Sequence, residues 1–376
     1  MPEAITLVFA RKLRVAGEIL EGEIHLDFTE LTRDKIEEVH VKLRGSIFTK
    51  ITRQRGQNSI TRRERIELVR DTVSVWRHGG AYPPPGTHIL KLPFHFTLPS
   101  NLLPSCEFSG YRKEGTVGYS IEVVGARSGF RFDKRTLCPM PVLPADPRGA
   151  ELSRELRAGW TGDWRTVEFA RKIRRGIWGD YSHVKMALVI PSLDVLPIFT
   201  PIPFTLNVVT VSKPMKREET PEGESVFPAP PLTPKGAEFR LERNVYVRTH
   251  NWATTSDGNP VAVLGGLAPT APNPKFYDHV QVEGMEKVWL PALGDEKKQK
   301  GSWKQEVTFR STFMLTCPPS FESPSMVVTY VMQLKVGFPG IGNDLEGRFP
   351  IRIVSSMQPP GAGAWDGPPP ELDLPP

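Results

Sequence analysis

Apolar and polar residues alternate strictly in many short stretches of this 376-residue chain. The stretch TVGYSIEVV at residues 116–124 is one example. Because successive side chains of a β-strand point to opposite faces, a period of two predicts a strand with one buried face and one wet face. Such strands are typical of antiparallel sandwich sheets. The same alternation marks residues 23–28, 38–44, 90–98, 184–191, 203–212, 239–249, 305–315, 327–336 and 348–354.

Proline and glycine divide the chain into pieces that suit strands better than helices. The 38 prolines are about twice the usual share, and 32 glycines accompany them. The apolar content of 39% and the charged content of 24% are typical of a globular protein. We therefore predict an all-β protein without long helices.

One alternating pattern occurs twice, around Tyr119 and again around Tyr330. Each copy follows a turn that contains proline, at residues 99–108 and 318–325. Two sandwiches of similar topology in tandem would explain the repeat, and a chance likeness between two strands is the alternative. The predicted division is residues 1–147 for the first sandwich, 148–165 for a polar connector, 166–356 for the second sandwich with long loop insertions, and 357–376 for a disordered Pro/Gly-rich tail.

Three segments of the second sandwich lack alternation and are rich in Pro, Gly, Thr and charge. They are residues 213–237, 254–275 and 291–302, which we expect to be long mobile loops. Within the connector, residues 150–157 could form a short helical turn.

Charge and cysteine content bear on the partners and the compartment. A formal charge of +6 permits an anionic partner without requiring one. Cys106, Cys138 and Cys317 are too few and too far apart for a disulfide framework or a metal site. The start of the chain lacks the apolar run of a signal peptide, and no apolar stretch approaches the roughly 20 residues of a membrane span. These features favour the cytosol and predict no metal and no other cofactor.

Four stretches carry a family resemblance. ITLVFARKLRVAGEILEGEIHLDF at residues 5–28 and IEEVHVKLRGSIFTKI at 36–51 resemble the opening strands of the arrestin N-terminal domain. YPPPGTHILKLPFHFTLPSNLLPS at 82–105 is the most specific stretch, and it resembles the family's run P-x-G-x-(H/Y)-x-(F/L)-x-F. VKMALVIPSLDVLPIFTPIPFTLNVV at 184–209 is similar to the start of the arrestin C-terminal domain.

The resemblance implies two tandem immunoglobulin-like sandwiches, the arrestin fold, and an adaptor role without catalysis. Among arrestins the chain looks closer to the fungal α-arrestins, which recruit a ubiquitin ligase through Pro-Pro-x-Tyr motifs. No Pro-Pro-x-Tyr motif is present here, because residues 82–85 have the reverse order and residues 368–376 contain no tyrosine. A ubiquitin ligase would therefore be recruited indirectly, through a partner or a longer isoform, or not at all.

The densest charge cluster is KITRQRGQNSITRRERIELVR, residues 50–70, which we call the basic hairpin. Gly56 to Ser59 predict a turn between two strand-like arms. Arginine presents a planar, always-charged fork that suits phosphate and carboxylate oxygens. The hairpin is therefore a candidate docking surface for phospholipid headgroups or for an acidic or phosphorylated receptor tail, and a solvated mobile hairpin is the alternative. Nucleic acid is not expected. The candidate residues are Lys50, Arg53, Arg55, Arg62, Arg63 and Arg65.

A second basic group, Arg11, Lys12 and Arg14, lies in the predicted first strand. The apolar side chains of this predicted strand, from Ile5 to Val15, share one face, and Arg11 interrupts that face. Lys12 and Arg14 point to the other face. By resemblance, basic residues near this place are phosphate sensors in receptor-binding arrestins. The alternative is that Arg11 marks the emergence of the strand into solvent.

Signatures of catalysis are missing from the sequence. It contains no Gly-x-Ser-x-Gly elbow, phosphate loop or paired-histidine zinc helix, and we do not expect an enzyme. We expect a cytosolic adaptor, peripheral at the plasma membrane or endosome, that links a membrane transporter or receptor to endocytic and ubiquitylation machinery. A constitutive scaffold or sorting-complex subunit with the same fold is the alternative. An enzymatic or carbohydrate-binding sandwich would need an acidic or aromatic cluster on one rim.

Overall fold

The computed structural model describes residues 3–129, 132–176, 179–220, 224, 226–269, 280–292 and 300–361. Strands dominate these residues, and the two α-helices among them are α1 (Phe28–Asp34) and α2 (Pro147–Ala158). Short 3₁₀ turns, η1 (Arg217–Glu219) and η2 (Pro234–Gly236), occur in the second half. The prediction of an all-β protein is confirmed. Within the described ranges, neither α-helix has the length and apolar character needed to cross a bilayer.

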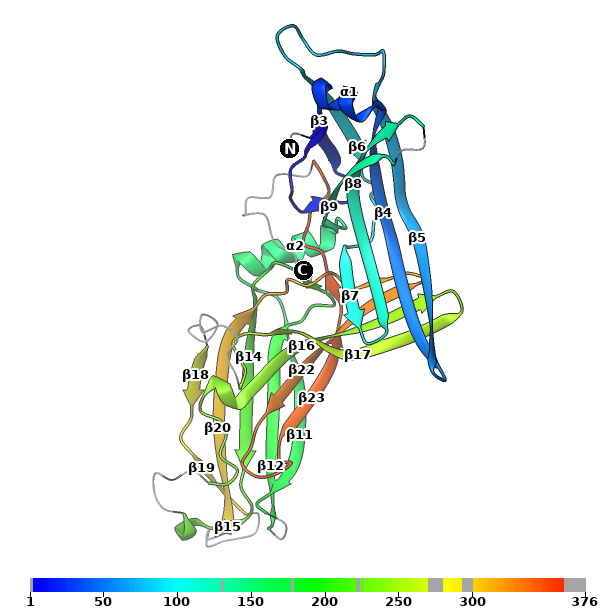
Figure 1. Ribbon diagram of the computed structural model, residues 1–376. Helices are drawn as coiled ribbons and strands as arrows, with labels where there is room; N and C mark the ends of the chain where they lie inside the picture. The colour runs from blue at the N-terminus through cyan, green and yellow to red at the C-terminus, as the bar shows by residue number, and fades with distance from the viewer. Residues whose placement is uncertain are drawn as a thin grey trace.

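The first half folds into two sheets that pack face to face, which we call the first sandwich (Figure 1). The smaller sheet has the order β1 (Ile5–Val8), β3 (Ile19–Asp27), β6 (Ile89–Thr97). The larger sheet has the order β5 (Asn58–Arg77), β4 (Ile36–Arg55), β8 (Lys113–Arg127), with β7 (Cys106–Gly110) and β9 (Lys134–Met140) on the far edge of β8. A short parallel pair joins β2 (Arg14–Val15) to β10 (Val142–Leu143).

The second half forms a second pair of sheets, the second sandwich. One sheet has the order β11 (Trp164–Arg174), β12 (Tyr181–Pro191), β14 (Ile202–Val211), β20 (Lys300–Phe313), with β15 (Met215–Lys216), β18 (Gln281–Gly284) and β19 (Val288–Pro291) also paired to β20. The other has the order β17 (Trp252–Val263), β16 (Ala237–Thr249), β22 (Met326–Val336), with β21 (Phe321–Glu322) and β23 (Leu345–Ile351) on the far edge of β22. A short parallel pair again joins β13 (Leu196–Pro197) to β24 (Ile353–Val354).

Alternation predicts the buried faces correctly in both sandwiches. In β3, Ile24 and Leu26 are fully buried. In the second sandwich the ring of Phe239 on β16 lies 5.3 Å from that of Phe204 and 5.5 Å from that of Phe313, on the opposite sheet. Burying each such side chain contributes about 1.5–3 kcal/mol, so these faces hold the sheets together.

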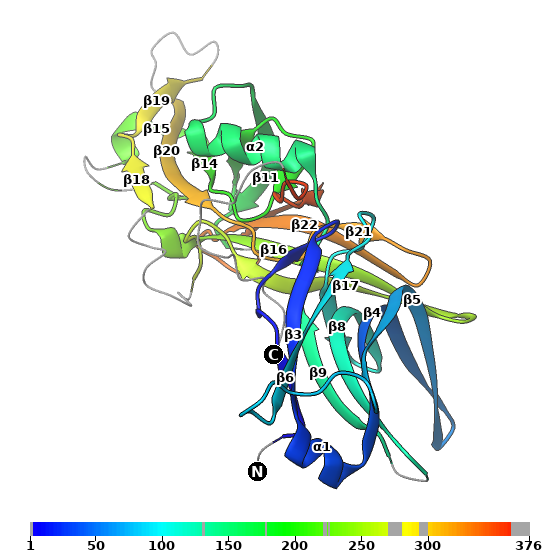
Figure 2. The same cartoon turned by 90° about the horizontal axis from the view of Figure 1, so that it is seen from above.

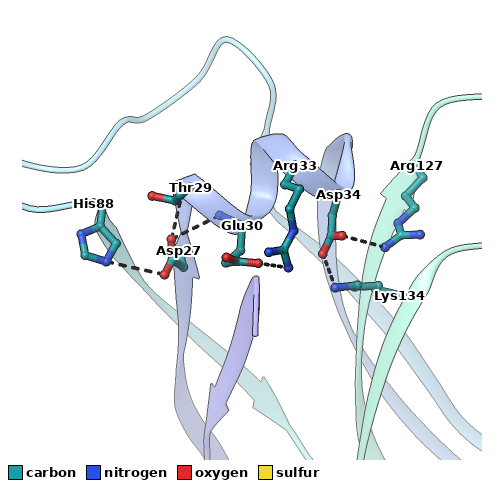
Figure 3. Close-up of polar contacts among 8 residues, drawn as sticks. All are labelled: Asp27, Thr29, Glu30, Arg33, Asp34, His88, Arg127 and Lys134. Carbon is teal, nitrogen blue, oxygen red and sulfur yellow. Dashed lines mark hydrogen bonds and ion pairs between the residues drawn. The ribbon is translucent and has the colours of Figure 1, made fainter. Parts of the chain in front are cut away.

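A short helix, α1, stands where alternation predicted the end of a strand. Phe28 is its first residue, because the carboxylate of Asp27 caps the helix and accepts hydrogen bonds from two backbone N–H groups, at 3.0 and 3.3 Å. At the other end, Asp34 binds Lys134 of β9 and lies 3.4 Å from Arg127 of β8 (Figure 3). The hydrogen bond from Lys134 holds the pKa of Asp34 below its ordinary value. The helix is thus tied to the larger sheet of the first sandwich.

The segment predicted as a connector, residues 148–165, contains most of α2. Asp146 caps this helix by accepting a hydrogen bond from the backbone N–H of Gly149 at 2.9 Å. Leu152 and Leu156 lie on one face of the helix and are buried. The helix is therefore a packed element of the protein and longer than the predicted turn.

Part of the segment 254–275 is a strand, contrary to the prediction of a loop. Residues up to Val263 continue β17, which pairs with β16 on one side and with none of the other described strands. Alternation of apolar residues is weak there because an edge strand keeps much of both faces in water. The predicted loops at 270–275 and 293–299, and the tail from residue 362, lie outside the described residues.

The two sandwiches meet at the β16–β17 hairpin, which lies across the ends of β4 and β8 (Figures 1 and 2). The hydroxyl of Thr49 on β4 donates a hydrogen bond to the backbone carbonyl of Arg248, at 2.8 Å. On β8, Gly115 leaves room for Met326, whose sulfur would lie 3.1 Å from a Cβ at that position. Arg243 of β16 donates to the sulfur of Cys106 at 3.9 Å. These contacts place β4, β7 and β8 of the first sandwich against the second sandwich.

Candidate functional site

The pleat of the β4–β5 hairpin divides the basic hairpin into two faces. Residues that lie opposite each other in an antiparallel pair point to the same face. Thr49 is opposite Glu64 and Ile51 is opposite Arg62, and Thr49 and Ile51 are buried. We call this the inner face, which also carries Arg53. The outer face carries the pairs Phe48 with Arg65 and Lys50 with Arg63.

On the inner face, two candidate arginines are engaged with the second sandwich. The guanidinium carbon of Arg53 lies 4.7 Å from the ring centroid of Trp252, and that of Arg62 lies 4.5 Å from it. Arg53 also donates to the backbone carbonyl of Ala253 at 3.3 Å, and Arg62 donates to the side chain of Asn251. Each cation–π contact contributes about 0.5–2 kcal/mol. These two residues thus link the two sandwiches.

On the outer face, Arg63 and Arg65 are exposed and contact no carboxylate among the described residues. Arg65 lies over the ring of Phe48 at 5.6 Å and donates to the hydroxyl of Ser46 at 3.2 Å. Both contacts orient the guanidinium without neutralising its charge. Lys50 differs, because its ammonium is paired with Glu114 at 2.7 Å.

The end of the hairpin adds one more available cation. Arg55 is exposed next to the turn at Gly56, which adopts a left-handed conformation with φ of 62°. No ion pair to Arg55 occurs among the described residues. Of the six candidates in the hairpin, Arg55, Arg63 and Arg65 therefore remain available to an anion.

The outer face also extends to residues outside the candidate set. Arg44 is opposite Arg70 in the pairing of β4 with β5. Arg44 donates to the backbone carbonyl of Asp71 at 3.0 Å, and Arg70 lies 3.6 Å from Glu67. Arg44 and Arg70 lie on the same face as Arg65 because of the strand register. The positions of the charges in the sequence do not reveal that register.

The second basic group does not lie on one continuous strand. β1 ends at Val8 and β2 begins at Arg14, so the predicted single strand is interrupted and its alternation does not continue to Val15. Arg11 and Lys12 are exposed, but Arg14 is only 3% exposed, contrary to the prediction that it points away from the core. No contact among the described residues joins this group to the basic hairpin.

Arg14 is buried with partners for both terminal nitrogens of its guanidinium, whereas its Nε has none among the described residues. Its guanidinium donates to Glu18 at 2.8 Å and to the carbonyl of Ala10 at 2.8 Å, and it lies 4.5 Å from the centroid of the Phe9 ring. Burial alone would raise the pKa of Glu18, but the Val15 N–H, Arg14 and Lys12 hold it below its ordinary value. Arg14 and Glu18 therefore form a structural ion pair, and Lys12 shares it at 3.1 Å.

The described residues offer little for catalysis. Cys106, Cys138 and Cys317 are free and buried. Burial raises the pKa of Cys106 to about 11 and that of Cys317 to about 12, so these thiols stay protonated and unreactive at neutral pH. No group of three or more metal-ligating side chains occurs in the described part of the chain. The exposed arginines of the basic hairpin can bind an anion through the N–H donors of their guanidinium groups.

The first sandwich also has a counterpart among known families. Residues 6–144 match the family model described as arrestin (or S-antigen), N-terminal domain. The matched span runs from β1 to β10, contains the whole basic hairpin, and supports the arrestin family. Residues beyond 144, which form the second sandwich, lie outside the match. No curated protein matches the chain.

Proposed function

We propose that this chain is a non-catalytic, arrestin-like adaptor that binds the acidic cytosolic tail of a membrane protein through the outer face of the basic hairpin. The observation that carries the proposal is the division of charge across the pleat. Arg63 and Arg65 are exposed and without a carboxylate partner among the described residues, and Phe48 and Ser46 orient Arg65, whereas Arg53 and Arg62 contact the second sandwich.

The chemistry of the available arginines, two on the outer face and one at the end of the hairpin, suits an extended acidic segment. Arg55, Arg63 and Arg65 lie along one hairpin, and each presents a planar fork of N–H donors that can bind a carboxylate or phosphate in two places. A tail that carries several carboxylates could therefore contact several arginines at once. Each surface ion pair contributes about 0.2–1 kcal/mol, so the affinity would be modest and would fall with added salt.

The wider role follows from the family that the first sandwich resembles. We place the adaptor in the cytosol, at the plasma membrane or endosome, where it would link a transporter or receptor to endocytic and ubiquitylation machinery. The finer assignment to the fungal α-arrestin type is part of this proposal. A ubiquitin ligase would be recruited indirectly, since the sequence has no Pro-Pro-x-Tyr motif.

A constitutive scaffold subunit of the same fold is the second candidate. The observation that favours it is the edge of β11, which pairs with β12 over 11 residues and with none of the other described strands. A free strand edge can add a strand from another protein. Affinity purification with mild crosslinking separates the two, because an adaptor recovers several membrane proteins and a subunit recovers one stoichiometric complex.

The binding proposal is tested with an oligoglutamate peptide and a charge-reversed triple variant. We expect Arg55→Glu, Arg63→Glu and Arg65→Glu together to weaken peptide binding about tenfold or more at low salt. Lys172→Glu, Lys216→Glu and Lys235→Glu make the matched control, because they change the charge equally at exposed positions of the second sandwich. Equal loss in both variants would mean that total charge, and not this face, binds the peptide. Anionic lipid vesicles in place of the peptide show whether a membrane surface is the better partner.

A further inference from the structure

The inner face of the basic hairpin is covered by the end of the β16–β17 hairpin. Between the strands of that hairpin the chain turns at His250, which has a left-handed backbone with φ of 54°. The turn brings residues 248–253 against β4 and β5. We call this set of contacts the clasp. Its members in the first sandwich are Thr49, Arg53, Arg62 and Glu64.

Most hydrogen bonds of the clasp use the backbone of the second sandwich. Glu64 accepts a hydrogen bond from the backbone N–H of His250 at 2.6 Å. Arg53 donates to the backbone carbonyl of Ala253, and Thr49 donates to that of Arg248. Backbone groups are common to any sequence with this fold. The side chains that make the clasp specific are therefore Trp252, Asn251 and Thr249, and Trp252 alone contacts both arginines.

Trp252 lies against both inner-face arginines at almost equal distance, 4.7 Å from Arg53 and 4.5 Å from Arg62. Two guanidinium groups on one indole ring would otherwise repel each other, and the electron-rich ring face stabilises both. Their N–H edges are also in use, by Ala253 and Asn251. In this arrangement Trp252 covers one face of each guanidinium and the second sandwich takes one N–H donor of each, so neither arginine has all of its donors free for an anion.

We propose that the end of the β16–β17 hairpin is a tethered competitor for the basic hairpin, and that Trp252 keeps Arg53 and Arg62 from the acidic partner until the clasp opens. The proposal rests on the function proposed above for the outer face of the same hairpin. It adds that the chain binds its partner in two stages. Arg55, Arg63 and Arg65 are accessible from the start, and the two inner-face arginines join them only when residues 248–253 leave.

Removal of the indole ring should therefore raise affinity for an anion. When only a small fraction of the protein is in the fully competent state, the apparent affinity for the ligand is reduced in proportion to that fraction. A variant that favours the open clasp therefore binds the anion more tightly. We expect Trp252→Ala to tighten oligoglutamate binding by about threefold to tenfold. This sign is distinctive, because the substitution changes no charge and ordinary loss of a surface contact would weaken binding or leave it unchanged.

The experiment uses the full chain and two variants, Trp252→Ala and Trp252→Phe. Phenylalanine keeps an aromatic face for the arginines, so it should stay near the wild type in both readouts. The readouts are oligoglutamate affinity and hydrogen–deuterium exchange of residues 49–64 and 248–256. We expect Trp252→Ala to speed exchange in both segments and to raise affinity. A thermal melt establishes that each variant is folded.

The outcomes separate this proposal from the proposed function. If the triple variant of Arg55, Arg63 and Arg65 loses binding but Trp252→Ala binds as the wild type does, the docking surface stands and the competitor is overturned. Unchanged exchange in Trp252→Ala also overturns it, because the indole ring then does not hold the clasp. If neither the wild type nor Trp252→Ala binds the peptide, both proposals fail.

Discussion

The sheets β5-β4-β8 and β17-β16-β22 share one plan, although they lie in different sandwiches. In each, a long hairpin pairs with a central strand whose far edge holds two shorter strands. The central tyrosines have the same role, because Tyr119 donates to the carbonyl of Leu103 at 2.8 Å and Tyr330 to that of Pro318 at 2.7 Å. Both carbonyls lie in the proline-containing turn before the strand. The repeated sequence pattern thus corresponds to a repeated sheet.

The sheets differ in the residue that stands opposite each tyrosine. Opposite Tyr119 stands Gly45, whereas opposite Tyr330 stands Arg243. Gly45 lets the tyrosine ring lie on the backbone of β4, while Arg243 reaches Cys106 of the first sandwich at 3.9 Å. The hairpin ends also differ, since one is rich in arginine and the other carries Trp252. The comparison teaches that the two sheets share their core plan and differ in the residues opposite the tyrosines and at the junction.

The largest expected effect comes from filling the space under the first tyrosine. A Cβ at Gly45 would lie 2.4 Å from Cδ1 of Tyr119, so Gly45→Ala should destabilise the protein by about 1–3 kcal/mol. Gly118→Ala on the outer face is the control, because its Cβ would meet Thr116 at an ordinary 3.7 Å. Chemical denaturation measures both. If Gly45→Ala is no less stable than Gly118→Ala, the close approach of the ring is not required.

The two tyrosine hydroxyls should contribute about equally to the free energy of unfolding. Tyr119→Phe and Tyr330→Phe each remove one buried hydrogen bond, at a cost of about 1 kcal/mol in the free energy of unfolding. Thermal or chemical denaturation of the two variants makes the comparison. A clear cost in one sandwich and none in the other would show that the two sheets are alike in topology only.

The smallest expected effect is a pH-dependent contribution of Glu18, in the first sandwich, to the free energy of unfolding. Because its hydrogen-bond and ionic partners outweigh burial, the pKa of Glu18 lies below the ordinary 4.5. Its contribution is therefore complete above that ordinary value and is lost as the pH falls through the lowered one. We expect Glu18→Gln to cost about 1 kcal/mol or less at neutral pH and nothing in strong acid. Glu322→Gln, at an exposed site on β21, is the control. A cost that stays constant from pH 7 into acid would contradict the assignment.

Much of this architecture could be predicted from alternation alone, because a half-buried strand must alternate. The buried set around Tyr119 and its repeat around Tyr330 are examples. The helix α1 was missed, since seven residues are too few for a helical period and its only local signal is the cap at Asp27. The strand part of 254–275 was missed because an edge strand is polar on both faces.

The candidate site was only partly predictable for a related reason. Local charge identified the basic hairpin, but its division into two faces depends on register with β5. The contacts of Trp252 with Arg53 and Arg62 join residues almost 200 positions apart, and no local sequence pattern encodes such contacts. Arg14 was misplaced because the chain leaves the strand after Val8, so counting by twos no longer applied.

The central claim, that the pleat separates a clasp face from a docking face, is tested most directly by hydrogen–deuterium exchange at residues 250–253. Two matched variants each remove two positive charges, Arg53→Gln with Arg62→Gln on the inner face and Arg63→Gln with Arg65→Gln on the outer face. We predict faster exchange in the inner-face variant, because the contacts with Trp252 and Asn251 are lost, and unchanged exchange in the outer-face variant. Unchanged exchange in the inner-face variant, or equal acceleration in both, would contradict the account.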